Sequence, residues 1–142
     1  MEPAFWDSSS LVPLCVQQAA TPKAEALSAN YLRVVWWGAP VEMRSSFARL
    51  LRTGRITPNG RVLALVVLDQ LRRDWREVDP SEELRERAES IIERFPLKAA
   101  DAFQLAAAWT WCLGRPRSRP FLSGDAQLLD AAKQLGFHVI ET

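Results

Sequence analysis

The sequence is poor in the residues from which many enzyme sites are built. It contains one histidine and two cysteines in 142 residues. A serine or cysteine triad needs a histidine base, and His138 alternates with the apolar residues Phe137 and Val139, a pattern typical of a packed or edge strand residue. Cys15 and Cys112 lie far apart without paired spacing, which argues against a zinc site and a disulfide framework. A reduced, cytosolic protein is the simplest expectation.

Glycine clusters and long apolar runs are also missing. The six glycines never gather into a phosphate-binding loop. The longest strictly apolar run, Val62 to Leu68, is far shorter than the roughly 20 residues that cross a bilayer. The first residues lack the basic and apolar segments of a signal peptide. We therefore expect neither a membrane span nor a secreted protein.

The composition is that of a globular domain. Hydrophobic residues make up 48% and charged residues 25% of a length that suits one domain, so we expect a single domain over residues 1–142. The net charge of +1 does not indicate a polyanionic partner. Arginine outnumbers lysine by fifteen to three and suits phosphate contacts, but a GC-rich genome would produce the same bias.

Strand and helix signals alternate along the chain. We expect strands at Ala4–Trp6, Leu32–Trp36, Phe121–Ser123 and His138–Ile140. We expect helices at Leu11–Gln18, Thr21–Ala29, Pro40–Gly54, Thr57–Trp75, Glu82–Arg94, Lys98–Leu113 and Ala126–Leu135. Ser8–Ser10 should stop the first strand, with Pro13 in the first turn of the next helix. This order predicts an α/β fold, a three-layer α/β/α sandwich with a central, mainly parallel sheet.

Four acidic residues stand out because of where these elements place them. Ligands of open parallel sheets bind at the carboxyl ends of the strands, and Asp7 and Asp125 each follow a predicted strand. Asp101 lies on a mostly apolar helix face, where a carboxylate is costly unless something neutralises it. Glu42 lies in the first turn of its helix, beside apolar core positions.

Each acid also has a structural interpretation. Asp7 could accept backbone hydrogen bonds in a turn, and Asp125 could cap the last helix. Glu42 could complement a helix dipole, which the pattern alone favours. Asp101 could pair with Lys98 or with an arginine. Taken singly, the acids are more often structural than catalytic, so the set carries the indication of a site.

Four stretches resemble PIN domains, specifically the VapC-type toxins of bacterial toxin–antitoxin pairs. These stretches are Phe5–Val12, Val41–Phe47, Leu97–Ala108 and Phe121–Leu129. Leu97–Ala108 is the closest and most specific match, and the four occur in the family's order over essentially the whole chain. The segment Trp36–Pro40, ahead of Glu42, departs from the polar helix start of relatives.

The resemblance implies a metal-dependent endoribonuclease that hydrolyses RNA phosphodiester bonds as the toxin of a toxin–antitoxin pair. The implied catalytic and metal-binding residues are Asp7, Glu42, Asp101 and Asp125, with Ser9 as a supporting hydroxyl. Oxygen ligands favour Mg²⁺ or Mn²⁺. The products would carry a 5′-phosphate and a 3′-hydroxyl. The implied partners are a small VapB-like antitoxin and a second copy of the chain in a homodimer.

RNA binding could involve the arginines of one proline-broken loop, Arg115, Arg117 and Arg119, through sequence-independent phosphate contacts. A solvated basic surface is the structural alternative. Two other functions stay open. The chain could be a PIN nuclease of RNA maturation or decay that is not a toxin. It could also be a non-catalytic PIN-like binding module, against which the presence of all four acids argues.

Overall fold

A five-stranded parallel sheet forms the centre of the protein, whose computed structural model describes residues 1–142. The strands are β1 (Glu2–Trp6), β2 (Tyr31–Trp36), β3 (Arg76–Val78), β4 (Pro120–Ser123) and β5 (His138–Glu141). Their order is β3-β2-β1-β4-β5, and every neighbouring pair is parallel. The predicted α/β fold with a parallel sheet is confirmed.

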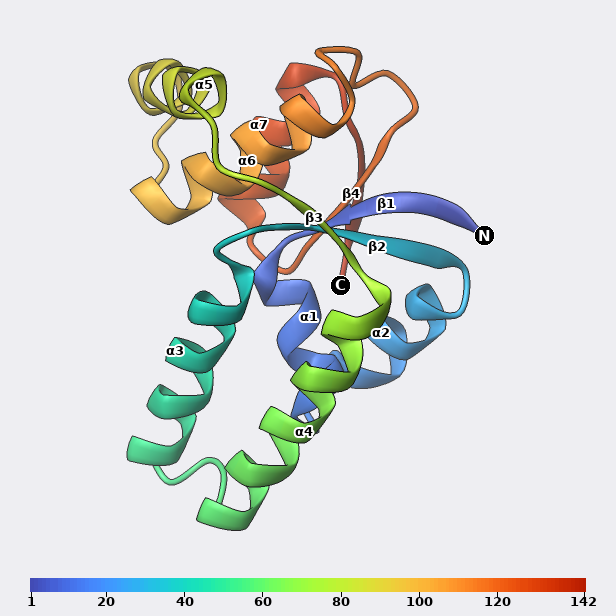
Figure 1. Ribbon diagram of the computed structural model, residues 1–142, viewed down its shortest axis with the longest axis vertical. Helices are drawn as coiled ribbons and strands as arrows, with labels where there is room; N and C mark the ends of the chain where they lie inside the picture. Colours follow the sequence, from blue (N-terminus) through green and yellow to red (C-terminus); the bar gives the residue numbers. More distant parts are fainter.

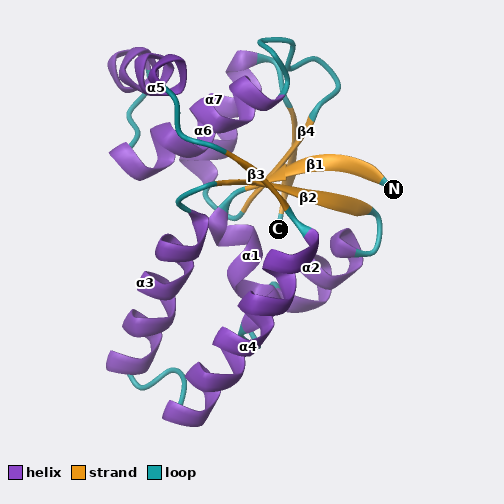
Figure 2. Ribbon diagram, viewed as in Figure 1, coloured by secondary structure: helices purple, strands orange, loops and turns teal.

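Seven helices cover the two faces of the sheet. They are α1 (Ser8–Cys15), α2 (Thr21–Ser28), α3 (Ala39–Arg52), α4 (Pro58–Asp74), α5 (Glu82–Arg94), α6 (Ala99–Trp111) and α7 (Ala126–Leu135). Helices α1 to α4 lie on one side and α5 to α7 on the other (Figures 1 and 2). None of the helices combines the length and apolar character of a membrane span.

Side-chain alternation along β1 divides the core into two layers. Phe5 faces α5, α6 and α7, while Ala4 and Trp6 face α1, α3 and α4. Phe5 also stacks on Phe121 of β4, with ring centroids 5.5 Å apart. This contact joins the two strands whose carboxyl ends carry Asp7 and Asp125.

Two local predictions are wrong. The serine run does not separate β1 from a later helix; Ser8 begins α1, which makes Pro13 an interior residue rather than a first-turn one. The edge strand β3 was not predicted, because its three residues contain one apolar side chain and directly follow the long helix α4. Cys15 and Cys112 are both free, as predicted.

Candidate active site

Asp7 is the most buried of the four acids, with 4% of its surface exposed. It lies between the end of β1 and the start of α1. The hydroxyls of Ser9 and Ser123 both donate to Asp7 Oδ2, the latter at 2.8 Å. Ser9 Oγ in turn accepts from the backbone N–H of Gly124 at 2.8 Å. Asp7 is therefore fixed from both α1 and the end of β4.

Glu42 is held in a similar way from two other helices. Ser8 Oγ of α1 and Gln104 Nε2 of α6 each donate to Glu42 Oε1 at 3.2 Å. Gln104 Nε2 also lies 2.9 Å from Ser8 Oγ, to which it donates. The side chain of Gln104 is fully buried, and its Oε1 has no hydrogen-bond partner. These contacts tie α1, α3 and α6 together around Glu42.

The two carboxylates share an asymmetry that matters for binding. In each, the protein's side-chain donors reach one oxygen only, Oδ2 of Asp7 and Oε1 of Glu42. No side-chain donor reaches Asp7 Oδ1 or Glu42 Oε2, and the backbone amides of Ser8 and Ser9 also donate to the Asp7 carboxyl group. Side chains therefore orient each carboxylate through one oxygen, and no side chain competes for the other.

Asp125 and Asp101 complete the set. Asp125 caps α7, since its Oδ1 accepts from the backbone N–H of Leu128 at 3.1 Å, so its structural interpretation is confirmed for that oxygen. Asp101 lies half-buried in the first turn of α6. It forms no salt bridge with Lys98 or an arginine, because the one salt bridge of the protein joins Arg85 to Glu82. The structural interpretation of Asp101 is therefore wrong.

Burial raises the pKa values of three of the four acids, and in two of them the charges of neighbouring acids add to the effect. Burial raises the pKa of Asp7, against the hydrogen bonds from Ser9 and Ser123. Burial, followed by the charges of Asp7 and Asp101, raises the pKa of Glu42 to about 7. Burial, followed by the charges of Asp7 and Asp125, raises the pKa of Asp101 to about 6, and Lys98 opposes this only in part. The site therefore holds an excess of negative charge that favours protons or cations.

The donor set fits a hydrated divalent cation. No three His, Cys, Asp or Glu side chains are placed so that they could enclose an ion directly. Mg²⁺, however, usually keeps several waters and takes only one or two carboxylates. Asp7 Oδ1 and Glu42 Oε2 are carboxylate oxygens that accept from no side chain, and Gln104 Oε1 is a buried acceptor without a donor. These residues suit Mg²⁺ or Mn²⁺ with one or two direct contacts and further contacts through water.

In the absence of metal, the protein is expected to lose stability as the pH rises from about 4 to about 7. Folding raises the pKa of Glu42 from 4.5 to about 7 and that of Asp101 from 3.8 to about 6. The folded state therefore binds more protons than the unfolded state, and this stabilisation is lost as the pH passes both folded values. After solvent screening, the loss should be on the order of 1–2 kcal/mol.

Urea unfolding in EDTA across this pH range would measure the effect. Glu42→Gln should flatten the pH dependence, whereas the exposed control Glu89→Gln should leave it unchanged. A stability that rises with pH in the wild type would contradict the proposed charge excess.

The other predicted residues are placed differently. Ser9 contacts Asp7, as expected of a supporting hydroxyl. The loop with Arg115, Arg117 and Arg119 precedes β4 and so lies at the amino ends of the strands, across the sheet from the acids (Figure 1). The structure does not bring these exposed arginines to the site, and their role in RNA binding stays a prediction.

Three site residues were not identified from the sequence. Gln104 is one helical turn after Asp101 on α6, and this spacing was the available signal for it. Ser8 and Ser123 flank predicted site residues, but only the packing of α1 against α6 and of β1 against β4 shows what they contact.

Comparisons with known proteins find likeness in structure. No protein-family model matches the sequence, and no curated protein matches it. A toxin–antitoxin complex from Klebsiella pneumoniae contains a similar chain with a TM-score of 0.62 and 16% identity, covering 87% of this chain and 88% of that one.

Two further structures cover almost the whole chain. VapBC2 from Rickettsia felis, bound to a DNA fragment from its promoter, matches with a TM-score of 0.65 and 8% identity over 97% of both chains. FitAcB from Neisseria gonorrhoeae matches with a TM-score of 0.66 and 15% identity over 96% of both chains. At these identities the likeness is one of fold, and the chain therefore has the PIN-like fold that the resemblance implied, shared with chains of toxin–antitoxin complexes.

Proposed function

We propose that this protein is a metal-dependent endoribonuclease that hydrolyses phosphodiester bonds of RNA. The observation that carries the proposal is the set of four carboxylates, Asp7, Glu42, Asp101 and Asp125, coupled by charge at one edge of the sheet without a basic partner in contact. A purely structural role would favour neutralising ion pairs. RNA as the substrate rests on the resemblance to PIN nucleases.

The residues have distinct roles in this chemistry. A bound Mg²⁺ or Mn²⁺ would supply an activated water and offset the charge that develops on the phosphate. Asp7 Oδ1 would bind the ion, while Asp101 and Asp125 would hold its waters. Glu42 Oε2 would bind the ion or position the attacking water. With a pKa of about 7, Glu42 is suited to exchanging a proton near neutral pH. Ser8, Ser9, Ser123 and Gln104 would keep the carboxylates oriented.

We further propose that the chain acts as the toxin of a toxin–antitoxin pair in the cytoplasm. The three similar structures support this, two of them being described as toxin–antitoxin complexes or VapBC assemblies. A small antitoxin would then block the site, and a homodimer would be the assembled form. Expression of the chain alone should arrest growth, and normal growth with active protein would instead favour a nuclease of RNA maturation or decay.

Cleavage of total RNA by purified protein would test the nuclease function. Discrete cuts are expected in Mg²⁺ or Mn²⁺, and they should vanish in EDTA and in Asp101→Asn. No cleavage in either metal by folded, antitoxin-free protein would overturn the proposal and favour a non-catalytic binding module. Cleavage that survives Asp101→Asn would show that the site lies elsewhere.

A further inference from the structure

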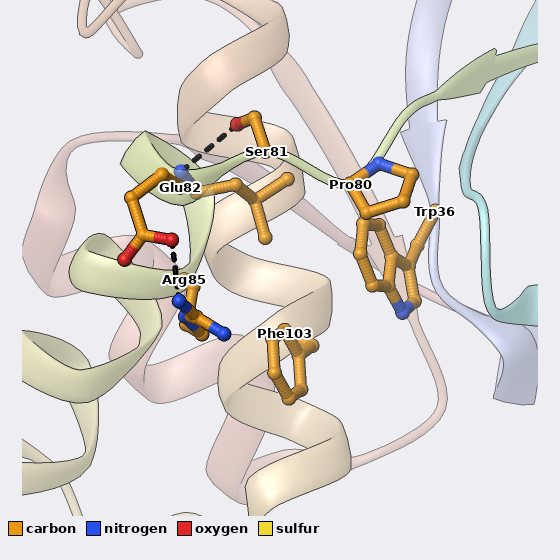
Figure 3. Close-up of a pocket in the computed structure, with 7 residues that line it drawn as sticks. Trp36, Pro80, Ser81, Glu82, Arg85 and Phe103 are labelled. Atoms are coloured by element: carbon orange, nitrogen blue, oxygen red, sulfur yellow. Dashed lines mark hydrogen bonds and ion pairs between the residues drawn. The ribbon is translucent and has the colours of Figure 1, made fainter.

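A surface pocket of about 390 Å³ lies between the end of β2, the start of α5 and the middle of α6. Its lining is mixed: two aromatic rings, two aliphatic side chains and an ion pair. These are Trp36 and Phe103, Pro80 and Leu84, and Glu82 with Arg85, and the remaining lining residue is Ser81. Figure 3 shows Trp36 and Pro80 on one side, Glu82 and Arg85 on the other, and Phe103 between them.

The pocket adjoins the acids without being lined by them. Phe5 is level with Val34 in the β1–β2 register, so two residues further on Asp7 is level with Trp36. Neighbouring strands lie ~5 Å apart, and the Trp36 ring contacts Phe103 of α6, two residues after Asp101. On α6 itself, Phe103 directly precedes Gln104, which holds Glu42. An RNA strand whose phosphodiester lies at the acids would therefore place a neighbouring nucleotide at the pocket.

The aromatic wall of the pocket consists of two stacked rings. The rings of Trp36 and Phe103 are parallel to within 2°, with centroids 5.5 Å apart. Since carbon atoms in contact are about 3.5–4.0 Å apart, the rings are offset from each other. Trp36 is 7% exposed and Phe103 is partly exposed, so most of the ring surface that a ligand can reach belongs to Phe103. Trp37, which is 54% exposed, meets Trp36 edge-on at 6.3 Å. The segment that departs from PIN relatives thus supplies two of the three rings.

Gly38 allows the indole of Trp36 to lie close against the backbone. A Cβ atom at this position would lie 2.6 Å from Nε1 of Trp36, whereas the backbone of Gly38 has φ −77°, which any residue can adopt. Glycine is therefore required by the close approach of the indole and not by the backbone. Trp36 is held against the end of β2 so that it faces α6.

The charges of the pocket select the kind of ligand. Glu82 and Glu83 occupy the first turn of α5, where they repel phosphate and other anions from the helix N-terminus. Arg85 offers a planar guanidinium opposite the rings, and its partner Glu82 offers acceptor oxygens at the rim. A flat, uncharged ring with donors and acceptors on its edge suits all three groups: the glutamates do not repel it, the guanidinium can stack on it, and the oxygens of Glu82 can accept from it. Unpaired RNA bases are bound in this way, stacked on aromatic or guanidinium planes.

We propose that this pocket binds one unpaired base of the RNA, next to the phosphodiester that the four acids cut. The inference rests on the proposed function and adds a subsite that selects single-stranded substrate. Because stacking of a base contributes about 1–3 kcal/mol, loss of the pocket should weaken RNA binding by about tenfold or more. The loss should raise KM and leave kcat nearly unchanged, because the pocket does not touch the reacting atoms.

An abasic scan of a short single-stranded RNA that the wild type cuts would test the proposal. One position beside the cut should raise KM about tenfold in the wild type when its base is removed. Arg85→Met and Phe103→Leu should raise KM to a similar extent with the intact RNA and should be insensitive to removal of that base. The exposed control Leu113→Ala should behave as the wild type.

Binding without metal provides a readout independent of cleavage. In EDTA, 2-aminopurine at that position should be quenched on binding to the wild type and to Leu113→Ala, but not to Arg85→Met. If the wild type cuts the RNA but no abasic position reproduces the effect of Arg85→Met and Phe103→Leu, the base-binding role of the pocket is overturned and the proposed nuclease function is not. Loss of a protein partner, with unchanged RNA binding, in the two variants would assign the pocket to that partner instead. Absence of cleavage by the wild type would instead remove the proposed function.

Discussion

Asp7→Asn should reduce RNA cleavage by at least about a hundredfold while the protein stays folded. Even residues that only support a metal ligand contribute about 10–100-fold, and Asp7 is the buried acid whose charge raises the pKa values of both Glu42 and Asp101. Asparagine has the same shape, and its oxygen can accept hydrogen bonds from the hydroxyls of Ser9 and Ser123. The substitution therefore removes the charge and keeps the hydrogen bonds.

The same change should stabilise the metal-free protein at about pH 8. Burial opposes ionisation of Asp7. A neutral amide at this position avoids the free-energy cost of a buried negative charge, so the folded state becomes more stable. Steady-state cleavage and urea unfolding in EDTA would measure the two effects, with the exposed Asp69→Asn on α4 as the control. A folded Asp7→Asn protein with near wild-type cleavage would remove Asp7 from the site.

The positions of Asp7 and Asp125 could be predicted because they follow from local signals. Each lies directly after an apolar strand, and the alternation of helices and strands makes those strands parallel. Parallel strands bring their carboxyl ends to one edge whatever the details of packing. Asp101 stood out as a carboxylate on an apolar helix face, whereas for Glu42 the resemblance to a family was needed, because its position in a first helical turn favours a structural role.

The contacts that orient the acids could not be predicted, because they depend on how helices pack. In the sequence, Gln104 resembles any other polar residue of an apolar helix. Its contacts with Ser8 and Glu42 arise only from the packing of α6 near α1 and α3. The structural alternative for Asp101, a salt bridge with Lys98, is not formed although the two are one turn apart. Strand β3 forms through its pairing with β2, in which Trp36 is level with Val78. Its own sequence has no strand pattern.

Phe121→Ala should lower the free energy of unfolding by about 3–5 kcal/mol, the cost of truncating a fully buried aromatic side chain. The ring stacks on Phe5, with which it is level in the β1–β4 register. Two residues further along the same register, Ser123 donates to Asp7. The cavity therefore opens beside the contact that orients the Asp7 carboxylate, and we expect cleavage per folded molecule to fall as well.

Leu68→Ala separates these two consequences. Leu68 is equally buried, but it lies on α4, on the other face of the sheet, and its truncation should cost about 2–5 kcal/mol. Urea unfolding would give the folded fraction of each variant, and cleavage at low temperature would be divided by that fraction. We expect Leu68→Ala to cut like the wild type and Phe121→Ala to cut more slowly. Equal activity per folded molecule in both variants would show that the register between β1 and β4 does not position Asp7, which would then depend on α1 and Ser9 alone.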